Sequence, residues 1–275
     1  MLRRMLTGYA PAALLILGMA LGAVAQAPSN GVETSQPMAA DADPSYAVAT
    51  IRPSDPDHPM AVEGSPIGHR SVMAGASVRF MLAFLYDVHD RQIVEAPAWL
   101  GTERFDIVGV ADVPGTPSLE QWKRMGRKLL VDRFGLKFHW ETREMLAYVL
   151  TVGKGGAKLE GSADQDGAPS FRGRADLGMK GQNLTMRNFA QLLQAGIMDR
   201  PVVDHTGLMG TYDFELRWAP DQTQFDGHFP VVADSADAPP GIFTAMQEQL
   251  GLKLSAEKTA VRVMVIDRVE QPSAN

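Results

Sequence analysis

The amino-acid sequence predicts an α+β protein of two pseudo-repeated units, each with two helices packed on a mostly antiparallel sheet. The main observation is a repeat: residues 199–218 (DRPVVDHTGLMGTYDFELRW) resemble residues 90–109 (DRQIVEAPAWLGTERFDIVG) at an offset of 109 residues. Helical periodicity just before each copy recurs at an offset of 108, and Gly-Leu-Lys after each copy recurs at an offset of 116. Offsets that hold over several elements indicate an internal duplication.

The matched positions include both charged and apolar residues. Asp90, Arg91 and Glu95 correspond to Asp199, Arg200 and Asp204. The apolar and glycine matches are Val94 with Val203, Leu100 with Met209, Gly101 with Gly210, Phe105 with Phe214 and Ile107 with Leu216. Each unit also opens with apolar residues at the i, i+3, i+4, i+7 spacing of a helix face, namely Val78, Met81, Leu82 and Leu85, then Met186, Phe189, Ala190 and Leu193.

The first 25 residues have the pattern of a cleaved secretory signal. Arg3 and Arg4 precede an apolar run centred on residues 14–17, and Ala23-Val24-Ala25 supplies the small residues of a cleavage site. We therefore expect the mature chain to begin at Gln26. The alternative, a retained membrane anchor, is disfavoured because the apolar run is short for a span of about 20 residues.

Composition narrows the function class. The chain has no cysteine, which excludes an acylated lipoprotein and any disulfide, so an exported protein of this size depends on its core. Its formal net charge is -6, and removing the two leader arginines makes it -8. This acidity disfavours nucleic acid and anionic membranes as partners, and we expect no cofactor and no membrane span in the mature chain.

The first unit is expected over residues 46–160, after a disordered linker at 26–45. A β-rich run at 46–51 ends at Pro53, and residues 55–69 are expected to be loop. Ser77 caps a helix that ends near Val88, and a strand follows at 105–111.

The same unit continues with a second helix and a hairpin. Ser118 and Gln121 form a capping-box pattern that opens a helix to Phe134, and Gly135 ends it. Alternating residues 136–141 predict a strand, which we expect to turn at 142–144 and return at 147–152.

The units are expected to be joined by a connecting loop at 161–182. The surrounding stretch is rich in glycine and charge and lacks periodicity. A phosphate-binding interpretation of Gly153-Lys154-Gly155-Gly156 fails because no Ser or Thr follows the lysine and no spaced glycine precedes it.

The second unit, over residues 183–270, repeats the plan and leaves a tail at 271–275. Thr185 caps a helix to Leu193, and residues 212–218 alternate as a strand with one buried face. An acidic excursion at 219–240 precedes a helix at 242–250, which Gly251 caps. The strand at 261–269 is apolar on both faces, so we expect it to be central in its sheet.

These segments carry a family resemblance. YAVATIRP, residues 99–112, LLVDRFGLKFHWETREMLAYVLTVGKGGAKL, the repeated DRPVVDHTGLMGTYDFELRW and the ending QEQLGLKLSAEKTAVRVMVIDRVEQPSAN resemble a large paralogous family of exported soil-bacterial proteins, typical of Acidobacteria and built on a domain of unknown function. The resemblance implies export, and relatives in which a similar domain is joined to a membrane-bound metallopeptidase-like sensor. It implies no activity and no catalytic residues. The chain departs from the pattern at Glu95-Ala96 and at His205.

The residues argue against three kinds of catalytic site. Asp204-His205-Thr206-Gly207 after two valines resembles the loop of aspartic peptidases, but two such loops must face each other and the matching position is Glu95. Zinc needs three converging ligands, and the six histidines are scattered without an i, i+4 pair. A G-x-S-x-G elbow for serine hydrolysis is absent from the sequence. We therefore predict no catalytic residue and no metal ligand.

The candidate site is the repeated charged segment. Its residues are a structural clamp or a possible ligand contact: Asp90, Arg91, Glu95, Asp199, Arg200, Asp204 and His205. A clamp is expected twice in a duplicated fold, whereas an active site more often survives once. We expect Arg200 to fork onto Asp204 or onto backbone carbonyls, and Arg91 to act likewise.

The leading hypothesis is a periplasmic or extracellular binding or interaction module, with a sensory role as one form of it. Its partner would be an envelope protein or a small ligand seated between the units. The alternatives are an unrecognised hydrolase of the cell envelope and a structural envelope protein. A polar cleft with converging carboxylates favours an enzyme, whereas an apolar patch or open sheet edge favours binding.

Overall fold

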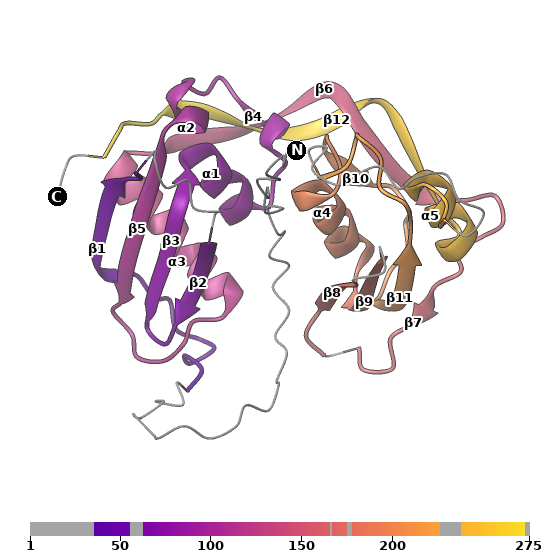
Figure 1. Ribbon diagram of the computed structural model, residues 1–275, viewed down its shortest axis with the longest axis horizontal. Coiled ribbons are helices and arrows are strands. Elements are labelled where there is room, and N and C mark those ends of the chain that lie inside the picture. The colour runs from indigo at the N-terminus through magenta and orange to yellow at the C-terminus, as the bar shows by residue number, and fades with distance from the viewer. Residues whose placement is uncertain (1–35, 56–62, 166, 175–177, 226–237, 273–275) are drawn as a thin grey trace, which may run out of the picture.

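The computed structural model describes residues 36–55, 63–165, 167–174, 178–225 and 238–272. Within these ranges the chain forms five α-helices and three four-stranded sheets (Figure 1). The expected leader and the start of the mature chain lie outside the described residues. Among the helices in these ranges, none is both long enough and apolar enough to span a membrane.

The first sheet belongs to the lobe drawn on the left of Figure 1, here called the first lobe. Its strands run antiparallel in the order β1-β5-β3-β2. They are β1 (Tyr46–Pro53), β2 (Glu63–Ile67), β3 (Arg70–Ser77) and β5 (Arg104–Ala111). The helices of this lobe are α1 (Val78–Tyr86), α2 (Trp99–Thr102) and α3 (Leu119–Phe134).

The predicted helix boundaries of this lobe are confirmed. The Ser77 hydroxyl accepts the Phe80 N–H at 3.1 Å at the start of α1. Ser118 and Gln121 form the predicted capping box on α3. Gly135 ends α3 at a φ of 59°, in the left-handed region that glycine adopts without strain.

The second lobe contains the second sheet, in the order β7-β11-β9-β8. Its strands are β7 (Glu160–Gly161), β8 (Ser170–Arg174), β9 (Gly178–Leu184) and β11 (Tyr212–Arg217). Two helices, α4 (Met186–Gly196) and α5 (Ile242–Leu250), complete the lobe. In both lobes the first strand in the chain pairs with the fourth, the fourth with the third and the third with the second.

The third sheet joins the lobes. Its two long strands, β6 (Lys137–Val152) and β12 (Leu252–Arg268), pair antiparallel along almost their whole length and arch over both lobes (Figure 1). Short strands close the ends: β10 (Val202–Asp204) runs parallel to β6, and β4 (Ile93–Val94), after the 3-10 turn η1 (Asp90–Gln92), runs parallel to β12. As predicted, the C-terminal strand is central.

Each lobe's core contains side chains from the long strand of the other half of the chain. Met264 and Ile266 of β12 pack in the first lobe with α1, α3 and β5. Tyr148 and Leu150 of β6 pack in the second lobe with α4, α5 and β11. We call the paired strands β6 and β12 the arch. The side chains named above are all even-numbered, and alternate residues share one face of a strand, so both lobes pack against the same face of the arch.

Four local expectations are wrong, the last of them in part. Residues 142–144, expected as a hairpin turn, continue β6, with Glu144 opposite Ala260, because β12 pairs with the whole strand. The expected connecting loop at 161–182 contains β8, most of β9 and the end of β7, and the expected loop at 55–69 contains β2. Part of the expected linker is ordered, since Met38 is buried and its N–H donates to the Thr116 carbonyl at 2.8 Å.

Gly109 tests the packing of β1 on β5. A Cβ at this position would overlap the ring of Tyr46. We expect Gly109→Ala to lower the free energy of unfolding by about 1–3 kcal/mol, the usual cost of overpacking. Gly196→Ala is the control, because a Cβ there meets nothing within 4 Å and alanine favours a helix. Denaturant melts that give equal stability for both variants would contradict this packing.

Candidate functional site

The lobes meet beneath the arch at a contact that we call the seam, formed by residues 87–95 after α1 and residues 194–204 at the end of α4. Gln194, which is buried, spans it. Its Nε2 donates to the Asp87 carbonyl of the first lobe at 3.0 Å, and its Oε1 accepts the Val202 N–H at 3.2 Å. One amide side chain therefore fixes the ends of two helices from opposite lobes.

His89 forms the second link across the seam. Its Nδ1 accepts the Arg91 N–H at 3.0 Å, and the ring also hydrogen-bonds the backbone of Met198 in the second lobe. Burial of the ring lowers the pKa of His89, and Arg91 acts in the same direction, whereas the Met198 hydrogen bond, Asp90 and Asp199 oppose the shift. The ring is therefore neutral at neutral pH, with Nδ1 free of a proton and able to accept.

The charged part of the seam centres on Asp199. Arg200 forks onto its carboxylate, with Nε and Nη2 donating at 3.0 and 2.8 Å, and the guanidinium lies over the Tyr148 ring at 5.1 Å. This hydrogen bonding from Arg200 lowers the pKa of Asp199. Arg91 reaches the same carboxylate from the first lobe at 3.8 Å. The structure thus brings together three of the seven predicted site residues.

The acceptor of the Arg200 fork is therefore Asp199, and the expectation of Asp204 was wrong. Asp204 instead accepts the Thr206 N–H at 2.9 Å and the Thr206 hydroxyl at 2.7 Å, closing a local turn. The His205 N–H donates to the Leu150 carbonyl at 2.9 Å, which extends the pairing of β10 with β6. The Asp204 side chain is used in this local turn and not by Arg200. Sequence spacing did not show which carboxylate Arg200 contacts.

The first copy of the segment is arranged differently. Asp90 accepts from Arg79 at 3.3 Å, and Glu95 accepts from Arg143 of β6 at 2.6 Å. The Arg91 side chain is 56% exposed, against 23% for Arg200. The predicted likeness of Arg91 to Arg200 is therefore wrong: Arg91 bridges the lobes, whereas Arg200 holds its neighbour.

A second charged row lies on the arch itself. His139 bonds Asp267 through Nδ1 at 2.8 Å and Glu141 through Nε2 at 3.1 Å, and Arg143 joins Glu141 at 2.7 Å. The hydrogen bond to Glu141, followed by that to Asp267, raises the pKa of the exposed His139. Sequence reasoning missed this row because Asp267 comes from a strand 128 residues away.

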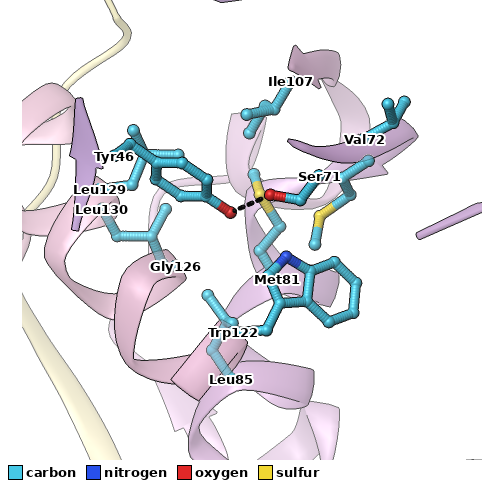
Figure 2. A pocket seen from close by; sticks show the side chains of 11 residues that line it. Tyr46, Ser71, Val72, Met81, Leu85, Ile107, Trp122, Gly126, Leu129 and Leu130 are labelled. Carbon is cyan, nitrogen blue, oxygen red and sulfur yellow. Dashed lines mark hydrogen bonds between the residues drawn. The ribbon is translucent and has the colours of Figure 1, made fainter. Parts of the chain in front are cut away.

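One cavity lies inside the first lobe, between the sheet and helices α1 and α3 (Figure 2). Its polar end is the Tyr46 hydroxyl, which shares hydrogen bonds with Ser71 at 2.9 Å and with Trp122. The rest of the lining is apolar and includes Met81 and Leu130. The volume of about 20 Å³ admits about one water molecule. A small-molecule site occupies several hundred Å³, so this cavity is a packing defect.

The charged groups of the seam make structural contacts with one another. Each predicted carboxylate is held by an arginine or by a local turn. Within the described ranges, no three His, Cys, Asp or Glu side chains gather closely enough to hold a metal ion. The seam therefore holds the lobes together without a converging pair of free carboxylates.

The middle of the arch is open to solvent. Here Thr142, Glu144 and Leu146 of β6, and Ala256, Lys258 and Ala260 of β12, are exposed, although the same face carries the cores at both ends. The even-numbered residues also direct their backbone groups outward, because the Tyr148 N–H donates to Pro201 and the Arg262 carbonyl accepts from Gln92. Between those anchors, no strand of the described chain pairs with either outer edge.

Comparison with known proteins gives one match. The profile of a family described as a protein of unknown function (DUF3738) matches residues 79–269. The matched segment begins at the first turn of α1 and ends just after β12, so it includes the seam and the arch. No curated protein and no solved structure matches the chain significantly.

Replacing Arg200 and replacing Arg91 should change the free energy of unfolding by different amounts. We expect Arg200→Ala to lower the free energy of unfolding by about 1–2 kcal/mol, because it removes two charge-assisted hydrogen bonds and the contact with Tyr148. Arg91→Ala should cost less than about 0.5 kcal/mol, as exposed ion pairs do. Arg200→Lys should recover only part of the loss, since an ammonium lacks the planar fork. A thermal melt of Arg200→Ala that matches the parent would contradict the clamp.

His89 predicts a pH dependence of stability. Its pKa is lower in the folded chain than its ordinary value of 6.5, so the unfolded chain binds the proton more readily. The stability from the neutral ring is complete above about pH 6.5 and declines as the pH falls toward the lowered pKa. His89→Asn keeps a capping oxygen and should reduce the loss of stability between pH 7 and pH 5.

The control is His139→Gln, whose sign is opposite. The raised pKa of His139 contributes stability below its ordinary value, which is lost as the pH rises through the raised pKa. Removing it should make the decline toward acid steeper. Denaturant midpoints across this pH range decide the matter, and a His89→Asn curve parallel to the parent's would refute the assignment.

Proposed function

Because the chain belongs to the DUF3738 family of proteins of unknown function, we propose that it is an exported interaction module of two duplicated units, which binds an envelope protein at the open arch. A hydrolase acting in the envelope is the alternative, and a structural envelope protein is the second.

The duplication is supported by strand pairing that follows the sequence offsets. Ile93 of β4 pairs with Met264 of β12, and Val202 of β10 pairs with Tyr148 of β6. Moving Ile93 on by 109 residues gives Val202, and moving Met264 back by 116 gives Tyr148. The two sequence offsets thus convert the parallel pairing of β4 with β12 into that of β10 with β6. In both cases the short strand of one unit pairs with the long strand of the other unit.

A matching irregularity in the two lobes adds independent support. In the first lobe, Asp106 accepts the N–H of Gly75 at 2.8 Å and the hydroxyl of Ser54 at 2.7 Å. In the second, Asp213 accepts the N–H of Asn183 at 2.8 Å and a serine hydroxyl at 2.6 Å. Gly75 and Asn183 both have positive φ, 68° and 55°, where β3 and β9 shift register.

The register shift in β3 and β9 also changes how the strands β5 and β11 align with each other. Ala76 and Leu184, each one residue before the capping Ser77 or Thr185, pair with Phe105 and Tyr212 respectively. Phe105 therefore corresponds to Tyr212, and the earlier match of Phe105 with Phe214 is out by two residues. A slip of two keeps every side chain on its own face, so hydrophobic alternation alone does not detect it.

Binding is favoured over catalysis by one observation, the exposed middle of the arch with its two open edges. Unpaired strand edges attract other chains, and monomeric proteins usually cover or shorten them. Extended segments of partner proteins bind by joining such an edge. A hydrolase would instead need a cleft with converging polar groups, and the cavity in the first lobe is small and mostly apolar.

Export is tested by intact mass. The leader pattern predicts that the full-length chain, expressed in a bacterial host with an outer membrane, appears in the periplasm or medium starting at Gln26. A mass that retains residues 1–25 would exclude cleavage and would support an anchored protein instead.

The interaction role is tested by photo-crosslinking in the organism that makes the protein. A photoreactive residue at Glu144 or Ala260, both exposed in the middle of the arch, should give protein adducts. Val131 on the exposed side of α3 is the matched control, because its side chain is 50% exposed and does not belong to the arch. Equal labelling at all three positions, or none at any, would reject the arch as the binding site.

A further inference from the structure

The open edge of β12 has a backbone ready to accept another strand. Ala256, Lys258 and Ala260 have the same parity as Arg262, whose carbonyl points outward to Gln92, so their N–H and C=O groups also point outward. In the described part of the chain no backbone group bonds to this edge between Leu254 and Ala260. The side chains of all four of these outward-pointing residues are exposed, which leaves the edge accessible.

The side chains beside this edge carry positive charge. Lys258 and Arg262 are exposed and lie on one face, four residues apart. Among the described residues, neither has a carboxylate within ion-pair distance, and Arg262 lies over the Trp140 ring at 3.9 Å. Glu144 is on the same face of the neighbouring strand, and the exposed Glu257 of β12 is on the opposite face, so the face of Lys258 and Arg262 carries a charge of about +1 in a chain whose net charge is -6.

The edge also has room for incoming side chains. Ala256 and Ala260 flank Lys258 on its own face, and Ala260 separates it from Arg262. Their small methyl groups leave room beside the two cations for the side chains of a partner strand. Charged side chains on a strand edge discourage pairing with strands of like charge, so Lys258 and Arg262 disfavour a basic partner strand and leave an acidic one favoured. On β6 the residues that face Lys258, Ala260 and Arg262 are Leu146, Glu144 and Thr142, and none of the three is a cation.

We propose that the β12 edge from Ala256 to Ala260 takes an extended, acidic segment of a partner protein as an added strand, with its acidic side chains on the face of Lys258 and Arg262. This assignment rests on the proposed interaction role and adds the partner's chemistry and its place. Backbone hydrogen bonds supply the pairing, and the two cations select carboxylates on the facing side of the added strand, directly opposite at positions four residues apart.

Synthetic peptides test the chemistry on the mature full chain. The probe is a fluorescent peptide of about eight residues that alternates Glu with Thr or Val, and the control peptide has Lys in place of Glu. Fluorescence anisotropy should show binding of the Glu peptide and at least about tenfold weaker binding of the Lys peptide. Methylation of alternate backbone nitrogens should abolish binding, because it removes the donors of an added strand.

Two proline variants test the place. Proline is tolerated on an edge where its missing N–H faced solvent, so Ala260→Pro should keep the fold and weaken the Glu peptide by about tenfold. Glu144→Pro makes the same change on the β6 edge and should leave the affinity within about twofold or tighter. Because a proline variant can fail to fold, Lys258→Glu with Arg262→Glu is a second test, and it should reverse the preference between the two peptides.

The outcomes separate this assignment from the broader role. Loss of binding at Glu144→Pro but not at Ala260→Pro moves the site to β6 and overturns the assignment, while the interaction role stands. Absence of peptide binding, or binding that no variant alters, also overturns it. Crosslinked adducts at the arch would then still support the interaction role, whereas their absence would remove both.

Discussion

The antiparallel pairing of β6 with β12 is the interaction on which the rest of the structure depends. It spans both strands almost completely and brings the two halves of the chain side by side. It also delivers Met264 and Ile266 to one core, and Tyr148 and Leu150 to the other. Burial of each such side chain contributes about 1.5–3 kcal/mol, so each lobe depends on the opposite half of the chain for part of its stability.

The seam and the open arch are two consequences of this pairing. The segments that carry β4 and β10 to the long strands, residues 87–95 and 194–204, meet at the seam. There Gln194, His89 and Asp199 join the lobes. Between the places where β4 and β10 pair with the long strands, the middle of the arch is exposed, and no strand of the described chain pairs with its outer edges. The polar residues that look most like a site by sequence therefore have a structural use, whereas the exposed edge is better placed to meet a partner.

Much of the fold could be predicted from sequence where local chemistry decides it. Ser77, Ser118 and Gly135 mark helix ends through their own side chains or backbone freedom, and the strand at 212–217 alternates clearly. Residues 142–144 were mistaken for a turn because their polar side chains suit one, and the pairing partner that straightens them lies more than a hundred residues away. The acceptor of Arg200 and the His139 row escaped for the same reason: both depend on how the chain folds back on itself, which residue spacing does not encode.

Splitting the chain tests the central claim most directly. A protease site inserted between Gly155 and Gly156 cuts an exposed loop after β6, where an added side chain meets nothing within 4 Å. If each core needs the other half's long strand, the two fragments will stay together on gel filtration and melt in one cooperative transition, and neither will fold alone. Two separate, folded fragments with independent transitions would contradict the account.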